Sequence, residues 1–235
     1  LKYYLKAVEL DEEDMYSLSD IAWLYDSFGK YEEALKYLER LEELGQDDSW
    51  TNTEFGFCLS RLKRYEEAIE KINRALEVDE EDKDMSYIYS QLGFCKKQLE
   101  EYDEAIEAFI QAKKWGRNDA WINVELGECY RLKNEIKKAL ECNLEAEKFD
   151  KKDPYIMSDI AWFYDNLEQY KEGLKYVKKA IKLGRNDAWI NVEYGACLAG
   201  LGKYEEAIEK FEYALSLKDE EKDIAFIYNQ LGWCH

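Results

Sequence analysis

The chain has 235 residues, of which 46 % are hydrophobic and 36 % charged, a balance that is typical of a folded protein and excludes an intrinsically disordered one. Its formal net charge of −19 (33 Lys and Arg against 52 Asp and Glu) disfavours nucleic acid and anionic membranes as partners and favours a cationic one. No apolar run approaches the roughly 18 residues of a membrane span, and the single histidine, His235, disfavours His-dependent catalysis and His-ligated metals.

From its first residues the chain shows a repeated pattern of helical segments. It opens in a helix at 1–10 and closes in another at 225–235, and a helix–turn–helix unit recurs between them. A small residue marks the second helix of each unit, at spacings of 34, 37, 34, 34 and 34: Ala34, Ala68, Ala105, Ala139, Gly173 and Ala207. The predicted repeats are 1–14 (partial), 15–48, 49–85, 86–119, 120–153, 154–187, 188–224 and 225–235 (partial). Since the chain begins without Met and inside a helix, we expect it to be an internal part of a longer protein.

Each unit carries the start and stop signals of two amphipathic helices. Apolar residues recur every three or four positions in 189–217, with a Gly-containing turn at 201–203. The pairs Leu44-Gly45, Trp115-Gly116 and Leu183-Gly184 are typical of a helix end with a left-handed glycine. The following aspartates, Asp48, Asp119 and Asp187, stand where the next helix needs an N-cap.

A longer repeat overlies the short one. Residues 16–48 match 155–187 closely, and residues 50–84 match 189–223, both at an offset of 139. This offset equals four units, so four helix pairs form a higher-order repeat.

These features together resemble the tetratricopeptide repeat (TPR) family. The Leu-Gly pair of that family stands at Leu92-Gly93, Leu126-Gly127 and Leu231-Gly232, and its late Ala recurs at Ala75, Ala112, Ala146, Ala180 and Ala214. The resemblance implies an all-α fold, a right-handed superhelical solenoid of six full repeats plus partial repeats at both ends, forming one solenoid over 1–235.

The sequence departs from the family at the Trp that normally precedes Leu-Gly by three residues. Asn52, Asn123 and Asn191 occupy that position in three units. Two positions earlier, every repeat has an aromatic residue, which lies on another face of the helix. These residues are Tyr16, Trp50, Tyr87, Trp121, Tyr155, Trp189 and Phe226. We expect these earlier aromatics to pack against the preceding unit.

In the TPR family, residues around the Leu-Gly pair of each first helix line the inner surface of the solenoid. Here the residue before Leu is mostly acidic and the residue after Gly mostly aromatic. The candidate groove residues are Asp20, Trp23, Glu54, Phe57, Gln91, Phe94, Glu125, Glu128, Asp159, Trp162 and Glu193. Carboxylates would pair with Lys or Arg and rings would stack. The alternative is that these side chains only pack between adjacent helices and pair with nearby Lys or Arg.

The resemblance implies a protein–protein interaction scaffold that binds an extended, basic or aromatic-containing peptide in an acidic groove. The alternative function is a structural spacer or a self-assembling rod, which would associate head to tail through the partial repeats. We expect protein or peptide partners, no nucleic acid and no membrane.

Neither catalysis nor a metal or other cofactor is expected. No catalytic constellation is present, and the acidic turns 79–84 and 218–223 lack the ligand-and-Gly alternation of a calcium loop. Five of six cysteines, Cys58, Cys95, Cys129, Cys197 and Cys234, share one repeat position, and Cys142 does not. We interpret them as small core residues of a protein in a reducing, cytoplasmic compartment.

Overall fold

A computed structural model describes residues 1–78, 81, 83–217 and 223–234. Helices are the regular elements of this described part, and the predicted all-α fold of stacked helix pairs is confirmed. The chain divides into two compact units, Leu1–Asn118 and Asp119–His235, hereafter unit 1 and unit 2. Each unit is described by itself, and the single solenoid over 1–235 with its repeat boundaries stays a prediction.

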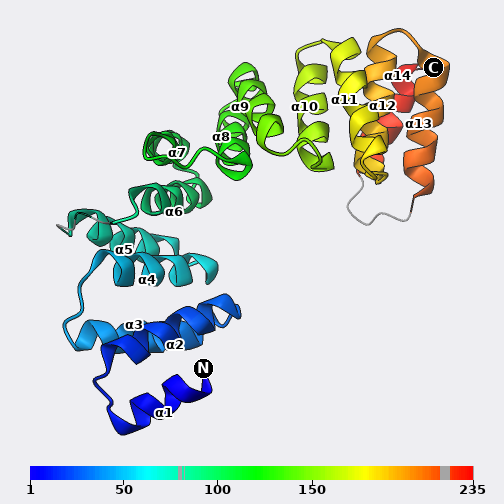
Figure 1. The fold of residues 1–235 in the computed structure, drawn as a ribbon. Coiled ribbons are helices and arrows are strands. Elements are labelled where there is room, and N and C mark those ends of the chain that lie inside the picture. Colours follow the sequence, from blue (N-terminus) through cyan, green and yellow to red (C-terminus); the bar gives the residue numbers. More distant parts are fainter. Residues whose placement is uncertain (79–80, 82, 218–222, 235) are drawn as a thin grey trace. The chain divides into compact units, whose positions relative to one another are not determined.

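Unit 1 consists of a leading helix and three antiparallel helix pairs (Figure 1). We call the first helix of a pair its A helix and the second its B helix. The elements are α1 (Lys2–Leu10), α2 (Met15–Ser27) with α3 (Tyr31–Glu43), α4 (Ser49–Arg61) with α5 (Tyr65–Glu77), and α6 (Met85–Gln98) with α7 (Tyr102–Lys114). Besides its own partner, each A helix contacts the next A helix, α2 with α4 and α4 with α6.

Unit 2 has three helix pairs and a closing helix. They are α8 (Ala120–Leu132) with α9 (Ile136–Phe149), α10 (Pro154–Asn166) with α11 (Tyr170–Lys182), α12 (Ala188–Gly200) with α13 (Tyr204–Ser216), and α14 (Ile224–Cys234). The helices α10, α12 and α14 lie in contact one after another. A helices therefore form one side of this unit, and the functional site is built on it.

The predicted helix boundaries are confirmed at both kinds of cap. The Asp48, Asp119 and Asp187 carboxylates accept hydrogen bonds from backbone N–H groups in the first turns of α4, α8 and α12, at 2.6, 2.8 and 2.9 Å. Such caps satisfy amides that have no partner inside the helix, and each contributes about 0.5–2 kcal/mol. Gly45, Gly116 and Gly184 adopt positive φ angles of 85°, 104° and 103° just after α3, α7 and α11.

The asparagines that replace the family's Trp form hydrogen bonds at the starts of the same helices. Asn52, Asn123 and Asn191 are buried, and each donates its Nδ2–H to the backbone carbonyl of the N-cap aspartate, at 2.9, 2.7 and 2.8 Å. Because the amide satisfies that carbonyl and is itself satisfied, the departure from the family pattern leaves the fold intact.

The A and B helices of a pair cross closely because small residues stand at the crossing. A Cβ placed on Gly195 would lie 2.6 Å from the Phe211 ring of α13, and one on Gly56 would lie 2.6 Å from the Ile72 side chain of α5. Cysteines fill neighbouring small positions: Cys58, Cys95, Cys129 and Cys197 are fully buried, which confirms their predicted core role, whereas Cys142 and Cys234 are half-buried. Burial raises the pKa of Cys95 to about 12 and so keeps it a thiol.

The turn inside each helix pair contains one residue in the left-handed backbone conformation, and in four turns this residue is not glycine. Gly29 and Gly202 have φ angles of 69° and 73° at this position. Non-glycine residues hold the same conformation elsewhere, with φ between 58° and 62°: Lys63, Glu100, Asn134 and Glu168. A side chain there costs roughly 1–2 kcal/mol, which glycine would avoid at some entropic cost.

We therefore expect Lys63→Gly, Glu100→Gly and Glu168→Gly each to stabilise the fold by about 0.5–1 kcal/mol, measured by urea denaturation. The control is Lys171→Gly, on the exposed part of α11, which should destabilise by about 1 kcal/mol. Loss of stability in all three turn variants would contradict the proposed strain.

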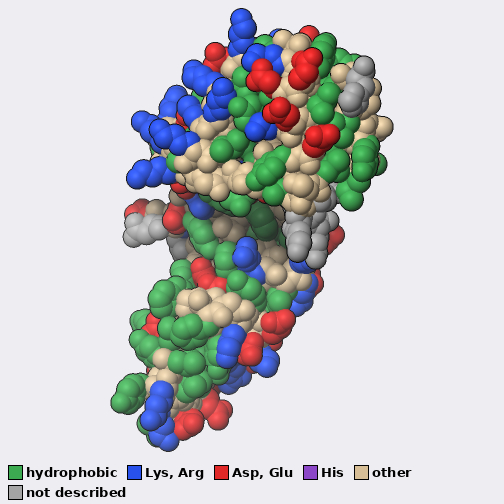
Figure 2. Space-filling model, turned by 90° about the vertical axis from the view of Figure 1, so that its right-hand side faces the viewer, with side chains coloured by type: hydrophobic (Ala, Val, Ile, Leu, Met, Phe, Trp, Pro, Cys, Tyr) green, Lys and Arg blue, Asp and Glu red, His purple; other side chains and the backbone are tan. Residues whose placement is uncertain are grey.

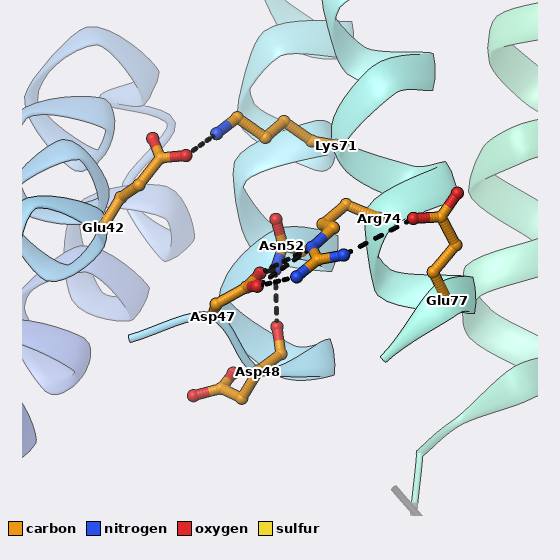
Figure 3. Close-up of polar contacts among 7 residues, drawn as sticks. All are labelled: Glu42, Asp47, Asp48, Asn52, Lys71, Arg74 and Glu77. Carbon is orange, nitrogen blue, oxygen red and sulfur yellow. Dashed lines mark hydrogen bonds and ion pairs between the residues drawn. The ribbon is translucent and has the colours of Figure 1, made fainter. Parts of the chain in front are cut away.

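Polar contacts join successive repeats on the B-helix side of unit 1 (Figure 3). Arg74 of α5 donates to both oxygens of Asp47, with its Nε at 2.9 and 3.1 Å, and Lys71 pairs with Glu42 of α3. Hydrogen bonds from Arg74 and Asn52 lower the pKa of Asp47 to about 2. Since Glu42, Asp47 and Arg74 are solvent-exposed and Lys71 is half-buried, these ion pairs add little stability.

Candidate functional site

The A helices of unit 2 carry two adjoining cavities. The first, of about 250 Å³, is lined by Val124, Glu128, Arg131, Asn143, Asp159, Trp162, Phe163 and Trp189. The second, of about 540 Å³, is lined by Tyr155, Trp162, Arg185, Asp187, Ala188, Trp189, Val192, Glu193, Asp223, Phe226 and Ile227. Both include Trp162 and Trp189, so the two cavities adjoin at these residues, and together they are hereafter called the unit 2 groove.

Aromatic rings are the most exposed apolar part of the groove. Tyr155, Trp189 and Phe226 expose 62 %, 38 % and 43 % of their surface, and Trp162 is half-buried. Figure 2 shows one face of the molecule, on which hydrophobic side chains lie exposed beside acidic ones. The expectation that these aromatics pack against the preceding repeat stays a prediction. The rings of Tyr155, Trp189 and Phe226 line the groove beside residues of the preceding repeat and remain partly exposed.

Two carboxyl groups line the same cavities as these rings, that of Asp159 half-buried and that of Glu193 buried. Burial raises the pKa of Asp159 on α10 to about 6, against an opposing effect of Arg185. Burial raises the pKa of Glu193 on α12 to about 8, and the charge of Asp165 adds to the shift. Glu193 is only 7 % exposed, and within the described residues its Oε2 has no hydrogen-bond partner. Glu193 therefore has unused acceptor capacity on an oxygen that the surrounding side chains cover.

A third carboxylate, Glu128 on α8, is already paired. The Arg131 guanidinium binds it through two hydrogen bonds of 2.6 Å and lies 5.9 Å from the centre of the Trp162 ring. This bidentate pair places one positive and one negative group at the same end of the groove.

One cation is held at the other end of the groove by the protein itself. The Arg185 guanidinium lies 4.6 Å from the Tyr155 ring centre and 4.7 Å from that of Trp189. Its Nε donates to Asp187 Oδ2 at 2.8 Å, and its Nη1 donates to the Ser158 hydroxyl. We call Tyr155, Ser158, Asp187 and Trp189 the arginine clamp.

Sequence reasoning did not single out Arg185, although a sequence feature marks it. Residues 116–125 and 184–193 are identical over ten positions, and the block contains Arg117 and Arg185. Arg117 likewise donates to a serine hydroxyl one repeat back, Ser90. An arginine that recurs between a glycine C-cap and an aspartate N-cap could thus have been recognised as a side chain that spans two A helices.

The predicted groove residues of unit 1 are not assembled in the same way. Glu54 lines a cavity of about 200 Å³ between α4 and α6, together with Trp50, Asp84 and Tyr87. Burial and the nearby Asp26 raise the pKa of Glu54 to about 7. The other predicted residues of this unit lie apart from that cavity: Phe57 and Phe94 pack against the core, Gln91 is buried, and Asp20 and Trp23 are exposed on α2.

In unit 2 the structure brings together four of the five predicted residues. Glu128, Asp159, Trp162 and Glu193 line the groove, whereas Glu125 is half-buried on α8 outside the two linings. The arrangement supplies rings and carboxyl groups that suit cationic side chains.

Other kinds of site have little support in the described part of the chain. No cluster of His, Cys, Asp and Glu within it is arranged to hold a metal ion. Most of the acidic turns at 79–84 and 218–223 lies outside the described residues. None of the described helices has both the length and the apolar character to cross a membrane.

Comparison with known proteins gave consistent matches. Family models described as tetratricopeptide repeat match residues 17–49, 47–114 and 159–221. Comparison with curated protein sequences gave no match.

Solved structures match at low sequence identity. YrrB, described as a TPR protein with an unusual peptide-binding site, is 21 % identical with a TM-score of 0.65, over 80 % of this chain and 95 % of that one. A tetratricopeptide repeat protein from Parabacteroides merdae is 15 % identical with a TM-score of 0.63, over 99 % and 90 %. The APC/C hetero-tetramer Cut9–Hcn1 is 16 % identical with a TM-score of 0.69, over 99 % of this chain and 45 % of that one. At these identities the likeness concerns the fold.

Proposed function

This chain belongs to the tetratricopeptide repeat family, a family of protein-interaction scaffolds, and from that premise we propose that its unit 2 groove binds an extended peptide. The peptide is basic or carries aromatic side chains, and its binding involves no catalysis. The observation that carries the proposal is that partly exposed rings share the lining of two adjoining cavities with the half-buried carboxyl group of Asp159 and the buried one of Glu193.

The chemistry of the groove favours Lys and Arg side chains over neutral ones. A ring within about 6 Å attracts a cation by roughly 0.5–2 kcal/mol, more where water is excluded. A carboxylate below the ring adds a charge-assisted hydrogen bond. Arg185 shows that both contacts can be made at once, because it lies between two rings while bound to Asp187.

The size of the groove suits several consecutive side chains. Its two cavities measure about 250 and 540 Å³ and follow one another along α8, α10, α12 and α14. YrrB has a similar fold and is described as having an unusual peptide-binding site. This similarity supports a peptide-binding role for the surface of the helices here.

The proposal is tested with an acetylated and amidated peptide that repeats Lys-Arg-Trp-Gly, and with its counterpart in which Glu replaces Lys and Arg. In calorimetry, we expect binding of the basic peptide only, weakened by raising salt from about 50 to about 300 mM. The Asp159→Asn/Trp162→Ala variant should lose at least about tenfold in affinity, since a charge and a stacking ring are both removed.

The matched control is Glu141→Gln/Phe149→Ala, which changes an exposed acid and an exposed ring on α9, away from the groove lining. It should bind as the parent chain does. Equal affinities of the groove variant and this control would overturn the proposal, as would equal binding of the acidic peptide.

We also propose that the protein works in a reducing compartment such as the cytoplasm. The cysteines of the described residues are free thiols, and four of them are fully buried in the helix crossings. Reducing conditions keep such thiols unmodified, and their burial leaves them few routes to disulfide exchange.

Self-association as a spacer or rod stays a prediction from the sequence. The closing helix α14 exposes Phe226, Tyr228 and Trp233, which could pack against another surface. Because Phe226 also lines the groove, such contacts would compete with peptide binding at that residue.

A further inference from the structure

We propose that unit 1 carries a second arginine clamp, formed by Tyr16, Ser19, Asp48 and Trp50, which binds the guanidinium group of an arginine supplied by a partner peptide. The inference rests on the proposed function, since it assumes a basic peptide. It adds a second site, on the other unit, with a preference for Arg over Lys.

The higher-order repeat relates the two clamps residue by residue. At an offset of 139, every member of the arginine clamp in unit 2 has an identical counterpart in unit 1: Tyr16, Ser19, Asp48 and Trp50 correspond to Tyr155, Ser158, Asp187 and Trp189. The nearby acids are also identical, Asp20 with Asp159 and Glu54 with Glu193. The arginine itself differs, because Gln46 stands where unit 2 has Arg185.

Gln46 reproduces the inner half of the Arg185 side chain. Its Nε2 donates to Asp48 Oδ2 at 2.6 Å, as Nε of Arg185 donates to Asp187 Oδ2 at 2.8 Å. Both nitrogens are the same number of bonds from the backbone. Arginine continues beyond this atom to the group that reaches the serine and the two rings, whereas glutamine ends there. The clamp in unit 1 therefore has no guanidinium of its own at Gln46.

The helices that carry these residues are arranged alike in the two units. The helices α2 and α4 contact each other as α10 and α12 do. Asp48 caps α4 in the same way as Asp187 caps α12. The rings are accessible: Tyr16 and Trp50 expose 89 % and 41 % of their surface, against 62 % and 38 % for Tyr155 and Trp189.

The chemistry of the clamp selects arginine. A planar guanidinium can stack on two rings and still donate sideways to a serine hydroxyl and an aspartate, as Arg185 does. A lysine ammonium is compact and strongly hydrated, and it cannot stack in this way. The acidic group of Glu54, which lines a cavity with Trp50, favours a cation of either kind, so the rings supply the discrimination.

The two clamps provide reciprocal variants. Gln46→Arg should supply unit 1 with its own guanidinium, and Arg185→Gln should give unit 2 the sequence of unit 1. The probes are acetyl-Gly-Arg-Gly-amide and acetyl-Gly-Lys-Gly-amide, followed through the indole N–H signals of Trp50 and Trp189 in NMR spectra.

In the parent chain we expect the arginine peptide to shift the Trp50 signal, at concentrations at least about fivefold lower than the lysine peptide requires. Gln46→Arg should weaken this response at least about tenfold, and Arg185→Gln should create a response at Trp189. Circular dichroism confirms that each variant is folded. If Arg185→Gln does not fold, Gln46→Arg still decides the matter, since the identical neighbours in unit 2 accommodate arginine.

The inference is overturned if the arginine peptide leaves Trp50 unmoved, or if Gln46→Arg responds as the parent chain does. Its failure is separable from that of the proposed function, which is read in the affinity change caused by Asp159→Asn/Trp162→Ala. A Trp50 response that persists in that double variant supports the clamp whatever the unit 2 groove does.

Discussion

Replacement of Gly195 by Ala is expected to lower the free energy of unfolding by about 1–3 kcal/mol, measured by urea denaturation. The added methyl group would meet three ring carbons of Phe211 at 2.6–2.8 Å. Phe211 is fully buried, so it cannot move aside without displacing its own neighbours. Either the ring leaves its preferred rotamer or α12 moves away from α13, and each loses packing at the crossing of the pair.

Gly232→Ala is the matched control, because Gly232 occupies the same repeat position on α14 and its added methyl group would meet no atom within 4 Å. There the better helix propensity of alanine should raise stability by up to about 1 kcal/mol. The two substitutions are thus expected to have opposite signs. A Gly195→Ala variant as stable as the parent chain would contradict the close crossing of α12 and α13.

The second large effect is a loss of stability as the pH rises from about 4 to about 8. Burial raises the pKa of Glu193 in the folded chain to about 8. In the unfolded chain the pKa of a glutamate is about 4.3. Between these values the folded state holds the proton and the unfolded state does not. Stability therefore falls with rising pH, by at most about 1.4 kcal/mol per pH unit for this group, and levels off above about pH 8.

Glu193→Gln should remove this dependence, because the amide cannot ionise. We expect the variant and the parent chain to have similar unfolding free energies near pH 4, with the variant more stable by about 2 kcal/mol at pH 6 and by up to about 5 kcal/mol above pH 8. Urea denaturation across this range measures the difference. Glu212→Gln, which changes an exposed glutamate on α13, is the control and should follow the parent chain. Parallel curves for Glu193→Gln and the parent chain would show that Glu193 titrates normally.

The same proton is expected to link peptide binding to pH. At pH 7 the Glu193 carboxyl group is largely protonated, since its pKa is about 8. A Lys or Arg side chain placed beside it favours the charged form and lowers that pKa. The proposed groove thus gains negative charge as a cation enters.

The parts of the fold that follow local rules could be predicted from the sequence. Asp187 is a polar residue before an apolar helix, and Gly184 follows the last turn of another, so helix ends could be predicted from neighbouring residues alone. The 34-residue spacing then predicted the pairing of α12 with α13, because a helix with one apolar stripe must cover it with the next. Cys197 was correctly placed in the core for the same reason.

The groove depends on contacts between helices that no local rule provides. Tyr155 and Trp189 occupy the same repeat position, and spacing alone does not decide whether such a ring faces the preceding unit or the solvent. In unit 2 the positions of these two rings depend on Arg185, whose guanidinium lies near both of them. Its long side chain also reaches the hydroxyl of Ser158, a residue 27 positions earlier. The burial of Glu193 likewise comes from how α10, α12 and α14 pack together, so its raised pKa could not be inferred from the sequence.

The central claim is that the A-helix side of unit 2 is the binding surface, and the tryptophan signals test it most directly. The chain has seven tryptophans, and titration with the Lys-Arg-Trp-Gly repeat peptide can be followed at each indole N–H by NMR. We predict saturable shifts of Trp162 and Trp189, which line the groove, and none of Trp115, which is exposed after α7. Shifts of Trp115 without any of Trp162 and Trp189 would contradict the account.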